Sequence, residues 1–204
     1  MKKLLFFVAL VVFGLTTMNA QEEAKEDTKK GAEKIYDQAK TGGFIVGANI
    51  GLPIHEAGDI SSFNTGADIA YLFEVMENLE VGVLVGYTHF FGDGEYKVYE
   101  GNDDIIVANY QDAGFVPIST TARYYFSDRK FFAGLDLGYA INVSGDADGG
   151  LFLRPKFGFN LGKISLIGSI QRITGGVDYQ EGEVSDVAKV SGFNSFNFGI
   201  EYGF

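Results

Sequence analysis

The chain has 204 residues, a formal net charge of −11 and no cysteine. Without cysteine, a disulfide framework and a thiolate metal site or nucleophile are excluded, and the acidic charge disfavours a nucleic-acid partner. The composition includes 28 glycines, 15% aromatic residues and 3 prolines, which favours strands joined by turns over helices. The length suits one β domain.

The first twenty residues have the pattern of a secretory signal peptide. Lys2 and Lys3 precede an apolar run from Leu4 to Leu15, and Ala20 offers a cleavage point before Gln21. The run is shorter than the roughly 20 residues that a membrane-spanning helix needs. We therefore expect residues 1–20 to be removed on export.

Residues 21–41 are mostly charged or small, with six acidic and five basic side chains. Such a segment cannot bury enough apolar surface to fold alone. We expect a disordered tail on the periplasmic side. A short helix that plugs the barrel is the alternative.

From Gly42 onward apolar and polar residues alternate, which is the period of a β-strand with two different faces. No later segment is long and apolar enough for a membrane helix, so a membrane-embedded domain would have to be a closed barrel. The pattern predicts an all-β fold, an eight-stranded antiparallel up-and-down transmembrane β-barrel over residues 42–204. The predicted strands are 44–54, 62–73, 79–91, 116–126, 131–143, 151–161, 164–173 and 196–204.

The lengths of the connections alternate as well. Those after the second, fourth and sixth strands are short, whereas those after the third and seventh, 92–114 and 174–192, are the longest. Transmembrane barrels have short periplasmic turns and longer external loops, so both termini are expected in the periplasm. A soluble lipocalin-like barrel has no reason to alternate its loops in this way.

Seven ionisable side chains fall on the inward face by parity, that is, by their odd or even position along a strand in which successive side chains point to opposite faces. An eight-stranded barrel is just wide enough for its own side chains, and buried charges persist only when they are paired. We therefore expect a salt-bridged lumen; the alternative is a gated narrow channel in which exchange of partners opens a water path. The predicted lumen charges are Asp68, Glu80, Arg123, Asp136, Arg154, Lys156 and Glu201.

The four connections on the long-loop side contain 14 acidic and 2 basic residues. The plain interpretation is a solvated acidic surface. The sharper one is a divalent cation site that bridges to lipid phosphates, for which Asp146 and Asp148 are the candidates. Their segment lacks the later ligands of a calcium loop, so no metal is assigned.

Signals for an enzyme are weak. His55 and His89 lie near the external rim, where some outer-membrane hydrolases and acyltransferases place theirs, but no serine is two residues from either histidine. A hydrolytic dyad needs mutual geometry that two isolated histidines do not demonstrate. We expect a non-enzymatic protein without a cofactor, with a lipid-modifying enzyme at the rim as an alternative.

The last nine residues, F-N-F-G-I-E-Y-G-F, place Tyr202 and Phe204 on the apolar face of a strand that ends on an aromatic residue. This ending resembles the closing strand of bacterial outer-membrane barrels, where it is read by the barrel-assembly machinery. V-P-I-S-T-T-A-R-Y-Y-F, residues 116–126, likewise resembles the fourth strand of the OmpA-type and PorT-like outer-membrane barrel families. The chain lacks a peptidoglycan-binding domain after the barrel, so the resemblance does not imply tethering to the cell wall.

The resemblance implies a bacterial outer-membrane location and lipid as the surrounding partner. We expect a monomer that acts in membrane integrity or in surface contacts through acidic external loops, with porin-like transport as an alternative.

Overall fold

The computed structural model describes residues 42–100, 104–178 and 189–204. The predicted signal peptide and charged tail lie outside the described residues. Among the described residues, no helix has the length and hydropathy needed to cross a membrane.

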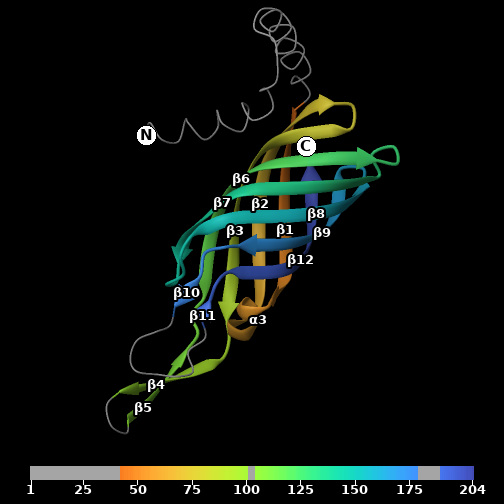
Figure 1. Ribbon diagram of the computed structural model, residues 1–204. Coiled ribbons are helices and arrows are strands. Elements are labelled where there is room, and N and C mark those ends of the chain that lie inside the picture. Colours follow the sequence, from red (N-terminus) through yellow and green to blue (C-terminus); the bar gives the residue numbers. More distant parts are fainter. Residues whose placement is uncertain (1–41, 101–103, 179–188) are drawn as a thin grey trace, which may run out of the picture. The chain divides into compact units, whose positions relative to one another are not determined.

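Eight antiparallel strands close into a barrel in which each strand pairs with its neighbours along the chain (Figure 1). Closure is completed by the first and last strands, which pair from Ile45 with Gly203 to Ile54 with Asn194. Because the first and last strands pair, the wall has no open strand edge. The barrel strands are β1 (Gly42–Ile54), β2 (Ser61–Met76), β3 (Leu79–Gly92), β6 (Ala113–Phe126), β7 (Phe131–Ser144), β8 (Gly150–Leu161), β9 (Ile164–Ile173) and β12 (Phe193–Gly203).

The predicted number, order and direction of the barrel strands are confirmed, and most boundaries agree within three residues. The long loops contain structure that periodicity did not predict. They carry a short helix, α3 (Glu56–Ile60), and two small hairpins formed by β4 (Glu95–Glu100) with β5 (Asp104–Asn109) and by β10 (Val177–Asp178) with β11 (Lys189–Val190). In Figure 1 these additions gather at one end of the barrel, and the C-terminus lies at the other. We call these the loop end and the turn end.

The outer wall is apolar. Large exposed side chains include Leu52, Val83, Leu137 and Ile200, and Phe198 is 72% exposed. The alternate residues of the same strands face inward and include small and polar side chains, such as Gly150, Arg154, Lys156 and Gly158 at the buried positions of β8. Exposed apolar surface over a whole barrel wall is unstable in water and stable in lipid, so the fold is a transmembrane β-barrel.

Two prolines interrupt the ladders of the wall. The β3–β6 register skips the positions opposite Val116 and Pro117, and the β8–β9 register skips those opposite Arg154 and Pro155. Proline has no N–H to donate, which accounts for a local break next to each.

Candidate functional site

The middle of the lumen is built around Asp136, which is fully buried on β7. Its Oδ2 accepts a hydrogen bond from Arg154 Nε at 2.8 Å, and its Oδ1 lies 2.8 Å from Lys156 Nζ. Arg154 also donates through Nη1 to Asp68 Oδ2 at 2.9 Å. One carboxylate thus holds two cations, and one of those cations reaches across the lumen to β2.

A second part of the network lies towards the turn end. Arg123 Nη1 is 2.7 Å from Glu201 Oε2, and Glu201 Oε1 is 3.9 Å from Lys156 Nζ. Lys156 therefore joins the two parts into one set of ion pairs, which we call the lumen network. Its members are Asp68, Arg123, Asp136, Arg154, Lys156 and Glu201.

Glu80 also points inward, but the structure pairs it elsewhere. It forms an ion pair with Arg129 of the β6–β7 turn and accepts a hydrogen bond from the Tyr125 hydroxyl at 2.8 Å. The guanidinium of Arg129 also stacks over the Tyr125 ring, 4.0 Å from its centroid. The alternation of side chains along a strand predicted that Glu80 points inward. It could not predict the partner Arg129, which lies in a turn and not in a strand.

Little empty space remains in the middle of the barrel, around Arg154 and Lys156. A cavity of about 20 Å³ beside Arg154 and Lys156 has room for about one water molecule. The charges and the inward side chains between them therefore fill the middle of the barrel.

A large apolar group lies on the inward face at the loop end. Phe90, Phe115 and Phe193 pack with ring centroids 5.0 to 6.2 Å apart, and Ile60 of α3 covers them. The prediction of a polar inward face did not include this group, although the alternation of the strands, continued towards the loops, places Phe90 and Phe193 inward. We call it the loop-end cluster. Its members are Ala57, Ile60, Phe90, Ala113, Phe115, Ala140, Ala147, Phe152, Ile173, Val177, Val190 and Phe193, with Tyr110 packed against them.

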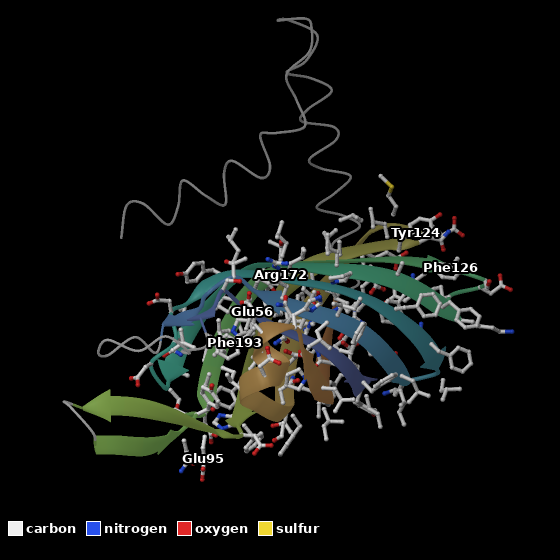
Figure 2. The ribbon with its side chains drawn as sticks, turned by 60° about the horizontal axis from the view of Figure 1, so that its bottom comes forward. Glu56, Glu95, Tyr124, Phe126, Arg172 and Phe193 are labelled. Carbon is white, nitrogen blue, oxygen red and sulfur yellow. The ribbon has the colours of Figure 1, made fainter. Side chains whose placement is uncertain are left out.

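Hydrogen bonds fix the loops over this cluster. Glu56 accepts bonds from the backbone N–H and the hydroxyl of Ser191, which keeps the pKa of this exposed carboxyl below its usual value. Figure 2 shows Glu56 on α3 near Phe193, whereas Tyr124 and Phe126 lie at the other end of the barrel. The contact ties the first loop of the loop end to the last one.

A hydrogen-bonded row lies on the rim at the loop end. Asp112 Oδ2 is 3.0 Å from His89 Nε2, and His89 Nδ1 is 2.8 Å from the Tyr87 hydroxyl. Asp112 Oδ1 accepts a bond from the Gly92 N–H at 2.8 Å, and this bond, with that from His89, lowers the pKa of Asp112. The row links β3 to the start of β6. His55, by contrast, is exposed, has a positive φ of 57° and takes no part in the row.

The other predicted site residues lie apart from these groups. Asp146 and Asp148 are exposed in the β7–β8 loop, where the Asp148 N–H donates to Gly176 O at 2.8 Å. Within the described ranges there is no group of three or more side chains of the kinds that ligate metals. Tyr202 and Phe204 face outward at the turn end, and the Phe204 N–H donates to Phe44 O at 3.0 Å.

Strand pairing, an apolar wall and a polar lumen define the class: a small transmembrane β-barrel of the outer-membrane type. No protein-family model and no curated protein matches the chain. Solved structures that it resembles include a designed transmembrane β-barrel, with 12% identity over 82% of this chain and 99% of that one and a TM-score of 0.45.

Two natural barrels show a similar degree of likeness. The attachment invasion locus protein Ail of Yersinia pestis is 12% identical over 80% of this chain and 97% of that one, with a TM-score of 0.42. Neisserial surface protein A is 13% identical over 79% and 97%, with a TM-score of 0.41. Because these identities and TM-scores are low, the class is assigned from the strand pairing and the burial pattern of the chain itself.

Proposed function

We propose that the protein is a non-enzymatic integral outer-membrane barrel that acts in membrane integrity or in surface contacts through its acidic external loops. The observation that carries this proposal is a lumen filled at two levels. The lumen network occupies the middle, and the loop-end cluster lies above it. A lumen obstructed at these two levels supports a role for the surfaces of the barrel.

The proposed orientation places the turn end in the periplasm and the loop end outside the cell. The short turns support this orientation, since outer-membrane barrels keep their long loops external. Outward-facing Tyr202 and Phe204 are proposed to act as the signal for the assembly machinery. Lipid would surround a monomer, and the loops would be open to divalent cations.

Planar-bilayer conductance tests the proposal against the porin-like alternative. We expect the refolded protein to give no current above the lipid baseline. A matched variant with Arg154→Ala, Phe115→Ala and Phe193→Ala removes one cation from the lumen network and two rings from the loop-end cluster, and should give a larger current than the unaltered chain. Stable single-channel steps from the unaltered chain would contradict a closed lumen.

A strain comparison separates the two proposed roles. Cells without the gene should become sensitive to detergent if the barrel supports membrane integrity. Complementation with a chain in which Asp146 and Asp148 are replaced by Asn should restore resistance if only the barrel matters. Failure to restore it would assign the role to the acidic loops.

A rim-located lipid-modifying enzyme is the second candidate, and the row of Asp112, His89 and Tyr87 favours it. A carboxylate that orients an imidazole, which in turn contacts a hydroxyl, is an arrangement used in acid–base catalysis. Mass spectrometry of lipid A would detect such activity as a change that His89→Ala abolishes. His55→Asn is the matched control, since that histidine lies outside the row.

A further inference from the structure

The turn end of the barrel contains a cavity of about 950 Å³ that the lumen network does not fill. Its volume lies in the range of small-molecule sites, which is roughly 300 to 1,000 Å³. Ionisable side chains surround it, in contrast to the apolar loop end. We call it the turn-end vestibule. Its charged lining residues are Glu80, Arg123, Asp128, Arg129, Lys130, Lys163 and Glu201.

Arg123 forms the floor of the vestibule, one inward position deeper than Tyr125, and is 1% exposed. Its Nη1 contacts Glu201, and its guanidinium stacks 4.7 Å from the centroid of the Phe132 ring. Its Nε and Nη2 have no hydrogen-bond partner among the described residues. These two nitrogens form one side of the guanidinium, where two parallel N–H groups can bind the two oxygens of a carboxylate.

The rim of the vestibule is held in an unusual backbone conformation. Ser127, Asp128 and Arg129 all have positive φ, at 52°, 55° and 61°. Consecutive non-glycine residues in this region are strained, and such strain persists where the surrounding structure enforces it. Arg129 of this turn lines the vestibule, and its side chain donates to Glu77 O and pairs with Glu80.

Two further cations lie at the rim. Lys130 and Lys163 are exposed and line the vestibule, and neither has an ion-pair partner in the described parts of the chain. Lys163 Nζ lies 5.8 Å from the centroid of the Tyr202 ring. Free cations around an opening raise the local concentration of anions.

We propose that the turn-end vestibule binds an organic carboxylate, held by Nε and Nη2 of Arg123 and attracted by Lys130 and Lys163. Because both nitrogens are buried, binding turns the guanidinium towards the cavity that it lines. A singly charged carboxylate suits the site better than a phosphate dianion, since Glu80, Asp128 and Glu201 also face the cavity and would repel a second charge.

Calorimetric titration of the full chain, refolded in an uncharged detergent at low salt, tests the proposal. The probes are propionate and acetyl-Ala-Ala, which each carry one carboxylate, and inorganic phosphate. We expect saturable binding of a carboxylate probe and at least tenfold weaker binding of phosphate. Preference for the free acid or for the peptide identifies the source of the carboxylate, and either preference supports the site.

Variants locate the binding. Lys130→Gln combined with Lys163→Gln leaves the wall unchanged and should weaken carboxylate binding about tenfold, which is the effect of about 1.4 kcal/mol. Arg123→Lys keeps the charge but removes the two parallel N–H groups of the guanidinium, and should abolish saturable binding. Arg172→Gln, an exposed cation at the loop end (Figure 2), is the control and should bind as the unaltered chain does. Undetectable carboxylate binding, tighter phosphate binding, or equal affinity in the lysine variant would overturn the proposal.

Discussion

At the scale of single residues, the lumen network shows how parity along a strand becomes a set of buried ion pairs. Asp136 is flanked by Arg154 and Lys156 because all three occupy inward positions at nearby heights on β7 and β8. The contact with Lys156 is at ion-pair distance but is not directed as a hydrogen bond. Buried pairs add little net stability, yet breaking one leaves a charge without compensation.

Asp136→Ala should therefore be strongly destabilising. The substitution leaves the buried cations of Arg154 and Lys156 without their shared partner, at a cost of about 3 to 5 kcal/mol. Urea unfolding in micelles measures the loss. Glu77→Ala, in an exposed turn, is the control and should change stability by less than about 0.5 kcal/mol. A loss of similar size in the two variants would show that the network contributes no special stability.

A second prediction at this scale concerns acid pH at the rim. The pKa of Asp112 is lowered in the folded chain below the ordinary value of 3.8, so its contribution is present above that value and is lost as the pH falls through the lowered pKa. Hydrogen exchange at the Gly92 amide should accelerate in that range, where the acceptor is protonated. Asp112→Asn should show no such pH dependence. A pH-independent difference between the two chains would contradict the assignment.

At the scale of elements, the strands could be predicted from the sequence because a barrel wall has a lipid face and a lumen face. Successive residues of a strand point to these two faces in turn, which produces the alternation of apolar and polar residues. β9 (Ile164–Ile173) had the expected boundaries even though Ile167 faces inward. The hairpins and α3 could not be predicted from alternation, since they depend on contacts between loops such as that of Glu56 with Ser191. The partner of Glu80 was missed for the same reason.

Two glycines make a matched test of the wall. A Cβ on Gly82 would lie 1.9 Å from Tyr71 O, whereas one on Gly168 would meet nothing within 4 Å. Gly82→Ala should destabilise the barrel by about 1 to 3 kcal/mol through this overlap. Gly168→Ala, between the exposed rings of Phe157 and Phe198, should be neutral or stabilising by up to about 1 kcal/mol.

Thermal unfolding in micelles compares the two substitutions. Equal effects would show that strand flexibility, and not close approach of β2 to β3, determines where glycine is required.

At the scale of the whole molecule, β1 and β12 determine whether the barrel closes. Their register extends over ten residue pairs, and the Phe204 N–H adds a bond to Phe44 O. The Phe204 ring itself is 72% exposed, so it contributes little to the packing of the finished barrel.

Deletion of Phe204 should consequently lower the amount of assembled protein in cells while barrels refolded in detergent keep nearly unaltered stability. Heat-modifiable gel migration of membrane fractions measures the assembled fraction. Phe198→Ala removes an equally exposed ring from the same strand and should assemble normally. Unaltered levels after the deletion would mean that Phe204 is not part of the assembly signal.

The lumen network also determines how the barrel responds to an electric field. Arg123, Arg154 and Lys156 are balanced by Asp68, Asp136 and Glu201, so the three cations and three anions sum to zero. A membrane potential does work only on charge that moves through it, about 2.3 kcal/mol per elementary charge for each 100 mV. The potential would therefore do no net work on a neutral set that moves as one unit. Changes in voltage across the envelope should leave the interior of this barrel undisturbed.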